Sequence, residues 1–303
     1  MKIFYGKAVY DKKEIQASIN VLKNKSFALI DGPSVKELER KIAKSFGKKY
    51  GLMVNSGSSA NLLALSILSN PILKDKRIKE NDEIITPAIT WSTTVFPIIN
   101  IHAKPVFVDV DLGSYNIDTK KIEKAITKKT KAIMLVHVYG NPCNLDKILR
   151  ICKKYNLQLI EDSCESLGAF YKNKSVGTFG RVGTFSFYYS HHITTLEGGV
   201  CVTNDFDLSE NLRVLRAHGW TRELKKRPKL SKQLKKIDNR FLFVNLGYNL
   251  RLTEIQGAMG SLQIKKLNKF VKLRRKASNY LLRNLSKYNN FISFQKQTEH
   301  SYH

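Results

Sequence analysis

The sequence has no apolar stretch that reaches the ~20 residues a bilayer-spanning helix needs. Its start, MKIFYGKAVYDKKEIQASI, has neither an apolar core nor a small-residue cleavage site, so no secretory leader is expected there. Cysteine is scarce: Cys143, Cys152, Cys164 and Cys201 form no C-x-x-C pair and share no metal-ligand spacing. These absences argue against a membrane span and against a zinc or iron–sulfur site, and they favour a cytoplasmic protein.

Acidic residues are also few, with 25 Asp and Glu against 52 Lys and Arg and a formal net charge of +27. Such a surplus suggests nucleic-acid binding, because phosphate neutralisation dominates that affinity. The basic residues are nevertheless spread along the chain, and the densest stretch, 222–240, lacks the interleaved aromatics of a single-strand-binding groove. We therefore expect no nucleic-acid partner, although the positive field would attract a small anionic substrate.

What the chain does contain is an alternation of strand and helix patterns over its first two thirds. Short β-branched runs such as DEIITPAI, KPVFVDVD, TKAIMLVHVYG, LQLIEDSC and VGTFSFYYS alternate with amphipathic runs such as DTKKIEKAI and LDKILRICKKY. Before the apolar positions of SVKELERKIAKSF, Ser34 and Glu37 have the spacing of a capping box. The alternation predicts an α/β fold around a mostly parallel sheet.

From about residue 250 the pattern becomes helical, in TEIQGAMGSLQIKKLNKFVKLRRKASNYLLRNL. This change predicts a large domain over residues 1–250 and the start of a smaller, incomplete domain over 251–303. The first 20 residues could pack on the smaller part. No internal repeat or low-complexity linker separates the two.

Ligands of open parallel sheets bind beyond the carboxyl ends of the strands, so the residues there are the first candidates. After GLMVN, the segment SGSSA could hold an anion at a helix start with Gly57, Ser58 and Ser59, or it could be a plain serine cap. After DEIITPAI comes Trp91, which could stack on a flat ring or belong to the core.

Three further strand ends carry titratable or amide side chains. Asp162 follows LQLIE with Glu165 three residues on, either as a helix cap with an exposed Glu or as an ion pair to a cationic heterocycle. His137 and Asn141 fit satisfied polar groups at a turn. His191 and His192 follow the fifth run, where a single histidine is more often structural than catalytic. Only their convergence with an anion cradle, an aromatic ring and a carboxylate favours a catalytic site.

Eight motifs, in their order along the chain, resemble those of the DegT/DnrJ/EryC1/StrS sugar aminotransferases. They are NSGSSANLL, TPAITWSTT, VFVDVD, GNPCNLD, LIEDSCESLGA, GTFGRVGTFSFYYSHHITTLEGGVCVTND, RAHGWTREL and GYNLRLTEIQGAMG. The resemblance covers almost the whole chain. It implies the aspartate-aminotransferase fold (fold type I of the pyridoxal-phosphate-dependent transferases) and pyridoxal phosphate (PLP) as the cofactor.

One departure from that family concerns His191, which stands where its aminotransferases have the lysine that forms a Schiff base with PLP. Imidazole has no primary amine, but it can move a proton near neutral pH. The same change marks a subgroup of 3-dehydratases that make 3-deoxysugars, which SHHITTLEGG, WSTT and RAHGWTREL resemble. A related branch binds an iron–sulfur cluster through extra cysteines, which are absent after Cys201.

The resemblance therefore implies an enzyme that removes the C3 hydroxyl of a nucleotide-linked 4-keto-6-deoxy hexose in deoxysugar and surface-polysaccharide biosynthesis. It would use pyridoxamine phosphate (PMP), recharged from PLP by L-glutamate, and would act as a homodimer with shared sites. His191 would be the catalytic residue. The cofactor would be held by Gly57, Ser58, Ser59, Trp91, Asp162, Glu165, Ser186 and, from the partner subunit, Asn249, and the sugar would meet His218 and Arg251. A nucleotide-sugar aminotransferase and a truncated non-catalytic relative remain as alternatives.

Overall fold

The computed structural model describes residues 6–24, 28–222, 224, 236–238 and 241–303. Most of the dense basic stretch 222–240 noted in the sequence therefore lies outside the described residues. Within the described part, no helix is long and apolar enough to cross a membrane.

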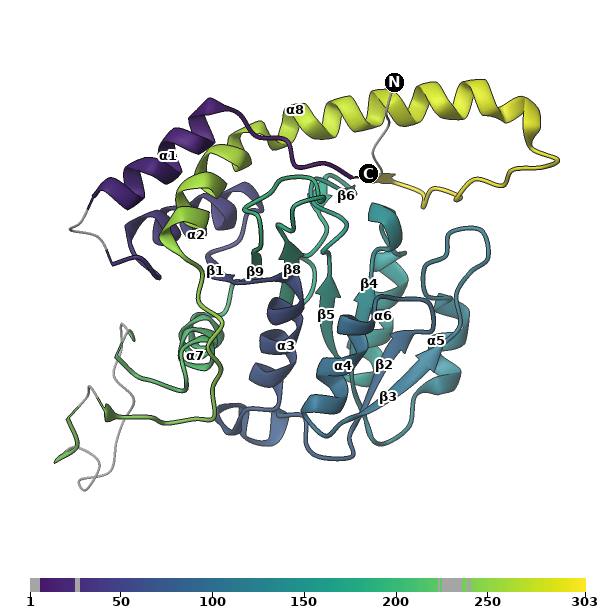
Figure 1. Cartoon of the computed structure of the whole chain (residues 1–303). Coiled ribbons are helices and arrows are strands. Elements are labelled where there is room, and N and C mark those ends of the chain that lie inside the picture. The colour runs from purple at the N-terminus through teal and green to yellow at the C-terminus, as the bar shows by residue number, and fades with distance from the viewer. Residues whose placement is uncertain (1–5, 25–27, 223, 225–235, 239–240) are drawn as a thin grey trace.

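The centre of the molecule is a seven-stranded sheet in the order β1-β9-β8-β5-β4-β2-β3 (Figure 1). In this sheet β9 is the one strand that runs antiparallel to its neighbours, which confirms the predicted α/β fold with a mostly parallel sheet. The strands are β1 (Tyr50–Val54), β2 (Glu83–Pro87), β3 (Lys104–Val108), β4 (Thr130–Val136), β5 (Gln158–Asp162), β8 (Val182–Ser186) and β9 (Gly199–Thr203).

Successive residues of a strand point to opposite faces of the sheet, and helices cover both of these faces. Ile84 packs under α3 (Gly57–Leu68), α4 (Ser92–Asn100) and α7 (Phe206–Arg216), whereas its neighbour Ile85 packs with α5 (Thr119–Ala125) and α6 (Leu145–Tyr155). A third apolar cluster joins β1, β8 and β9 to α2 (Pro33–Ser45) and α8 (Glu254–Leu285). Both faces of the central strands are therefore buried, as their continuous apolar runs require, whereas the edge strand β3 keeps exposed positions.

The start of α2 differs from the sequence prediction, and the capping box at Ser34 and Glu37 is wrong. The helix begins at Pro33 with Gly32 as its N-cap, so Ser34 is already inside the first turn. The backbone N–H groups of Ser34 and Val35 donate instead to the carboxylate of Glu254, at 2.8 and 2.9 Å. A side chain at Gly32 would lie 2.8 Å from that carboxyl carbon, so the cap from a distant helix needs glycine here.

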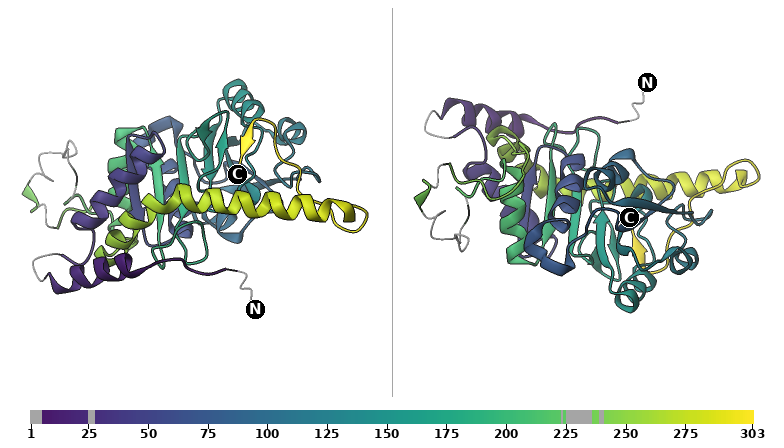
Figure 2. Two further views of the ribbon diagram at one scale, coloured as in Figure 1. Left: turned by 90° about the horizontal axis from the view of Figure 1, so that it is seen from above. Right: turned by 90° about the horizontal axis from the view of Figure 1, so that it is seen from below.

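Helix α8 extends from the body of the molecule toward its C-terminal segment. Its first half packs against α1 (Lys12–Lys23) and α2, and Figure 2 shows α1 alongside this part while the rest of α8 continues across the molecule. Past the short helix η5 (Ser286–Tyr288) the chain returns, and β10 (Ser301–Tyr302) joins β6 (Phe170–Tyr171) and β7 (Lys174–Ser175) in a small second sheet. The division at residues 250 and 251 stays a prediction.

The segment before the two histidines also differs in detail from its sequence pattern. The sequence pattern predicts a strand that extends to Tyr189, but β8 ends at Ser186. Elsewhere in the chain, two short helical turns, η1 (Pro71–Lys76) and η2 (Val138–Gly140), lie in connections between the strands and helices. Beyond Ser186, the backbone of Phe187 still bonds to Gly198 and Thr195, at 2.8 and 3.0 Å. The loop from 188 to 197 is therefore held at its base while its tip reaches the edge of the sheet.

Candidate active site

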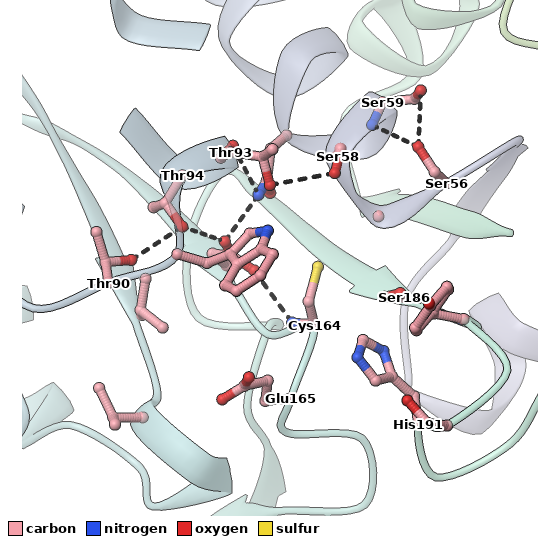
Figure 3. Close-up of a pocket in the computed structure, with 18 of the residues that line it drawn as sticks. Ser56, Ser58, Ser59, Thr90, Thr93, Thr94, Cys164, Glu165, Ser186 and His191 are labelled. Atoms are coloured by element: carbon pink, nitrogen blue, oxygen red, sulfur yellow. Dashed lines mark hydrogen bonds between the residues drawn. The ribbon is translucent and has the colours of Figure 1, made fainter. Parts of the chain in front are cut away.

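A cavity of about 670 Å³ lies at the carboxyl ends of the parallel strands (Figure 3). All five strand ends singled out in the sequence contribute to its lining. Of the site residues predicted from the sequence, those that line it are Gly57, Ser58, Ser59, Trp91, Asp162, Glu165, Ser186 and His191. The converging geometry of a parallel sheet thus brings together residues more than 130 positions apart in the chain.

The start of α3 forms one end of this cavity. Ser56 is the N-cap, and its hydroxyl accepts the N–H of Ser59 at 3.0 Å. The amides of Gly57 and Ser58 belong to the first turn, where an α-helix provides no acceptor and its dipole favours an anion. A Cβ on Gly57 would lie 2.6 Å from the Cβ of Ser186 and 2.8 Å from Sγ of Cys164, so only glycine leaves this approach open. The chemistry of these donors suits a phosphate group.

Asp162 lies at the floor of the cavity, is buried, and accepts three hydrogen bonds. Its Oδ2 accepts from Nδ2 of Asn61 and from Oγ1 of Thr94, each at 2.7 Å, and its Oδ1 accepts from the N–H of Cys164 at 3.1 Å. Asn61 is fixed in turn by the hydroxyl of Thr184, which donates to its Oδ1 at 2.6 Å. A carboxylate held in this way is aimed at the cavity and suits a cationic ring nitrogen.

The sequence interpretation missed Asn61 and Thr94, the two side chains that orient Asp162. A signal for Asn61 was present, because it lies in the apolar run ANLLAL of α3, most of which is buried, so that an amide there needs a partner. Thr94 sits within WSTT, but nothing in that motif distinguishes it from its neighbour Thr93. Only the fold shows that Thr94 faces the carboxylate, with the hydroxyl of Thr90 donating to it at 3.0 Å.

Aromatic rings and a second carboxylate lie at the mouth of the cavity. Trp91 precedes α4 and is 72% exposed, and Tyr139 in η2 is 70% exposed. Glu165 accepts the backbone N–H of Tyr139 at 3.3 Å. Partial burial, with the Asp162 charge acting in the same direction, raises the pKa of Glu165 above its ordinary value. The mouth therefore offers flat apolar surface beside a carboxyl group that protonates more easily than usual.

His191 lines the same cavity from the loop after β8, and Figure 3 shows it beside Ser186. Burial lowers the pKa of His191, and the positive charge of Arg274 acts in the same direction. The backbone of Ser186 and the carboxylate of Asp162 act in the opposite direction. The imidazole is consequently neutral at pH 7 and able to accept a proton.

His137 and Asn141 are satisfied polar groups at a turn, as the sequence suggested. The N–H of Cys143 donates to Nδ1 of His137 at 3.0 Å, so Nε2 carries the proton and faces Oε2 of Glu161 at 3.2 Å. Asn141 donates to the carbonyl of Lys296 and accepts from the N–H of Thr298, at 2.9 and 3.0 Å. These two side chains fix the wall of the cavity at η2 without entering it.

Three predicted site residues lie together outside the cavity of their own chain. Oδ1 of Asn249 accepts from Nη2 of Arg251 at 3.0 Å, and that nitrogen lies 3.2 Å from Nε2 of His218. His218 adopts a left-handed backbone conformation, with φ of 62°, and its side chain is exposed. The cluster is held in the loop before α8 by a backbone bridge between Ala217 and Asn249.

Comparison with known proteins gives a consistent family. The family described as "DegT/DnrJ/EryC1/StrS aminotransferase family" matches residues 9–303. The GDP-4-keto-6-deoxy-D-mannose 3-dehydratase of Escherichia coli O55:H7 is 45% identical over 277 residues, which are 91% of this chain and 70% of that protein.

Two solved structures share the fold over 99% of this chain and 77% of theirs. One is the E. coli GDP-4-keto-6-deoxy-D-mannose-3-dehydratase with bound hydrated PLP, at a TM-score of 0.90 and 43% identity. The other is a GDP-4-keto-6-deoxymannose-3-dehydratase with a trapped PLP-glutamate geminal diamine, at a TM-score of 0.91 and 42% identity.

Proposed function

The chain belongs to the DegT/DnrJ/EryC1/StrS aminotransferase family, and we propose that it is a PLP/PMP-dependent 3-dehydratase of a nucleotide-linked 4-keto-6-deoxy hexose, with L-glutamate as the amino donor. The two dehydratase structures that share its fold carry PLP or a PLP–glutamate adduct. The relative with 45% identity supports a GDP-linked sugar as the substrate to test first. The product would enter deoxysugar and surface-polysaccharide biosynthesis.

The absence of an amine from the cavity carries this proposal. No lysine lines the cavity in the part of the chain that the structure describes, and His191 occupies the loop after β8. A PLP-dependent aminotransferase needs a lysine to hold the aldehyde covalently and release it in each cycle. A cavity without one favours chemistry in which the cofactor is held by non-covalent contacts alone.

The donors around the cavity fit the cofactor at three points. The amides of Gly57 and Ser58, with the nearby hydroxyls of Ser59 and Ser186, would hold its phosphate. Asp162, oriented by Asn61 and Thr94, would keep the ring nitrogen protonated. Trp91 and Glu165 would adjoin the ring at the mouth. The bound cofactor would supply an amine that condenses with the sugar ketone and a ring that accepts the electron pair.

His191 would carry the proton chemistry of the reaction. Because its pKa is lowered, the neutral imidazole is available at pH 7 to accept a proton. The imidazolium that results would then protonate the departing C3 hydroxyl, so that one side chain serves as base and as acid. Asp162 partly offsets the effect of burial on this imidazole and would stabilise its charged form.

Asn249, His218 and Arg251 would complete the site from a second copy of the chain. Their place outside the cavity of their own chain, and the exposure of Trp91 at its mouth, support a homodimer with shared sites. An Asp162→Asn chain and an Asn249→Ala chain should each be inactive. Co-expressed, they should regain activity, because the mixed dimer contains one site with both residues intact. If a verified mixed dimer regains no activity, Asn249 contributes to the active site of its own chain and not to that of the partner.

The reaction itself is tested with the full chain, PLP, L-glutamate and GDP-4-keto-6-deoxymannose. Mass spectrometry of the product should show that its hexose has lost the C3 oxygen and that no amino group has been added to the hexose. His191→Asn should bind the cofactor without turnover. A nitrogen-containing sugar would indicate an aminotransferase, and absence of bound cofactor would indicate a non-catalytic relative. The cytoplasmic location stays a prediction.

A further inference from the structure

A second cavity, of about 180 Å³, lies on the other side of the histidine loop. His191 lines both cavities, whereas His192 lines only this one. Its other walls come from the N-terminal segment and from α8, which contribute Lys7, Gln263 and Arg274. The two cavities therefore share His191 as a lining residue.

The charged side chains of this cavity are cationic, and a buried polar atom in its lining has no partner among the described residues. Lys7 and Arg274 bring two positive charges, and no carboxylate is among the described residues that line the cavity. Arg274 donates to the carbonyl of His191 at 3.3 Å. Nδ1 of His192 is buried, and within the described residues it has no hydrogen-bond partner. Positive charge that converges on a small cavity attracts a counter-ion.

The nearest acidic side chains are already occupied by other partners. Lys266 pairs with both Asp11 and Glu14, at the start of α1. Glu14 also accepts from Nε2 of Gln263 at 2.8 Å, and Oε1 of Gln263 accepts the N–H of Thr194 at 3.2 Å. Gln263 thus separates this acidic pair from the cavity, and the charges of Lys7 and Arg274 stay without a carboxylate there.

We propose that this second cavity is a binding site for a small oxyanion, a carboxylate or inorganic phosphate, held by Arg274, Lys7 and His192 behind the catalytic histidine. The anion would lie against the face of the histidine loop that the cofactor does not reach. Two charge-assisted contacts from Arg274 and Lys7 would supply the attraction. His192, as the neutral tautomer with its proton on Nδ1, would be the third donor.

Occupation of this site would change the proton affinity of both histidines. Burial, and next the charge of Arg274, lower the pKa of His192 to about 3, and the same two causes lower that of His191. The charged groups that face the pair are Arg274 from α8, Lys7 from the N-terminal segment and Asp162 from β5, the last only toward His191. The titratable rings of Tyr188, 5.6 Å from that of His191, and Tyr189 adjoin them from the histidine loop itself. An anion beside Arg274 would offset its charge, so that both pKa values rise. An effect of the bound anion on turnover rests on the proposed function, whereas binding of the anion does not.

The test is a titration of the full chain, saturated with PLP, with sodium acetate and separately with phosphate at constant ionic strength and pH. The imidazole signals of His191 and His192 are followed by NMR after ¹⁵N labelling of histidine, with His191→Asn and His192→Asn variants for assignment. We expect a saturable shift in these signals. The anion that saturates at the lower concentration identifies whether carboxylate or phosphate is preferred.

Arg274→Gln should weaken anion binding at least about tenfold, which corresponds to about 1.4 kcal/mol, and Lys7→Gln should also weaken it. Arg283→Gln is the matched control, because Arg283 is exposed on the same helix and does not line the cavity. A shift that does not saturate, or that is equal in Arg274→Gln and Arg283→Gln, overturns the proposal. Histidine signals report binding whether or not the chain dehydrates a sugar, so failure of the proposed function is seen separately.

Discussion

Replacing Glu161 by Gln tests the buried hydrogen-bond network beneath the active site. Glu161 and His137 are both fully buried, and the carboxylate accepts four donors. Oε1 receives the N–H groups of Phe179 and Gly180, each at 2.6 Å, and Oε2 receives that of Gly177 at 2.8 Å and lies 3.2 Å from Nε2 of His137. Glu161 therefore fixes one loop and, through His137, the wall of the cavity at η2.

Glutamine has the same shape but cannot accept four donors. Whichever way the amide turns, its NH2 group faces two donors and leaves both without an acceptor. His137 cannot compensate by changing tautomer, because its Nδ1 is needed as the acceptor for Cys143 at 3.0 Å. Each unsatisfied buried group costs about 1–3 kcal/mol, so the substitution should lower the free energy of unfolding by about 2–6 kcal/mol. That is a large part of the total stability of a typical domain.

Urea unfolding followed by circular dichroism measures this loss. The control is Glu123→Gln, which removes an exposed carboxylate paired with Lys154 and should leave the unfolding midpoint almost unchanged. An unfolding midpoint for Glu161→Gln equal to that of the control would refute the reasoning, because the four donors would then have other acceptors.

The pH dependence of the same difference gives an independent check. Burial would raise the pKa of Glu161, but the hydrogen bonds from His137, Gly180 and Gly177 outweigh it and the pKa is lowered from 4.5. A carboxylate with a lowered pKa adds stability that is complete above its unfolded pKa and lost as pH falls through the folded value. The gap between the wild-type chain and Glu161→Gln should therefore shrink as the pH drops below 4.5. A gap that does not change with pH would contradict this.

Three more substitutions test separate parts of the structure. Gly57→Ala places a Cβ 2.6 Å from that of Ser186, so PLP affinity should fall at least about tenfold in a fluorescence titration. An unchanged affinity would show that the phosphate of PLP does not bind at Gly57. His191→Lys introduces an amine, so PLP should become linked in a form that borohydride traps, and dehydration should fall by at least ~100-fold. If the His191→Lys variant dehydrates the sugar at the wild-type rate and borohydride traps no linked PLP, residue 191 is not part of the catalytic site. Arg216→Met removes the fully buried cation that pairs with both Glu39 and Asp31, although Arg213 stays 3.4 Å from Glu39, and it should cost about 3–5 kcal/mol on urea unfolding. A loss well under 1 kcal/mol would show that the two carboxylates have other sufficient donors.

The strands and the position of the cavity could be predicted because both depend on local patterns. Short β-branched runs identify β1, β2, β4, β5 and β8, and a parallel sheet brings their carboxyl ends to one edge. Gly57, Trp91, Asp162 and His191 meet there without any pairwise signal in the sequence. The orienting contacts were not predictable in this way, since Asn61 and Thr94 approach Asp162 from helices 101 and 68 residues away.

The capping box failed for a related reason. The spacing of Ser34 and Glu37 is a local signal for an N-cap at Ser34. It competes with a Pro at the first helical position, Pro33, so that the helix begins two residues earlier than the capping box predicts. The acceptor that satisfies the first N–H groups comes from Glu254, 220 residues from Ser34. A local pattern cannot predict which distant carboxylate will reach a helix end, and such a carboxylate makes the local cap unnecessary.

The adjacent histidines show why a pair of like residues can serve different purposes. A chain that turns after β8 sends successive side chains to different sides, so His191 reaches the cofactor cavity and His192 only the smaller one. Burial lowers the pKa of both imidazoles, so that His191 is a neutral base at pH 7. The pKa of His192 is about 3, so its imidazole is neutral throughout the physiological pH range. Without an anion, His192 is therefore a poor proton donor or acceptor at pH 7. Arg274 touches the carbonyl of His191 and lowers the pKa of both rings, so one arginine on α8 links their protonation.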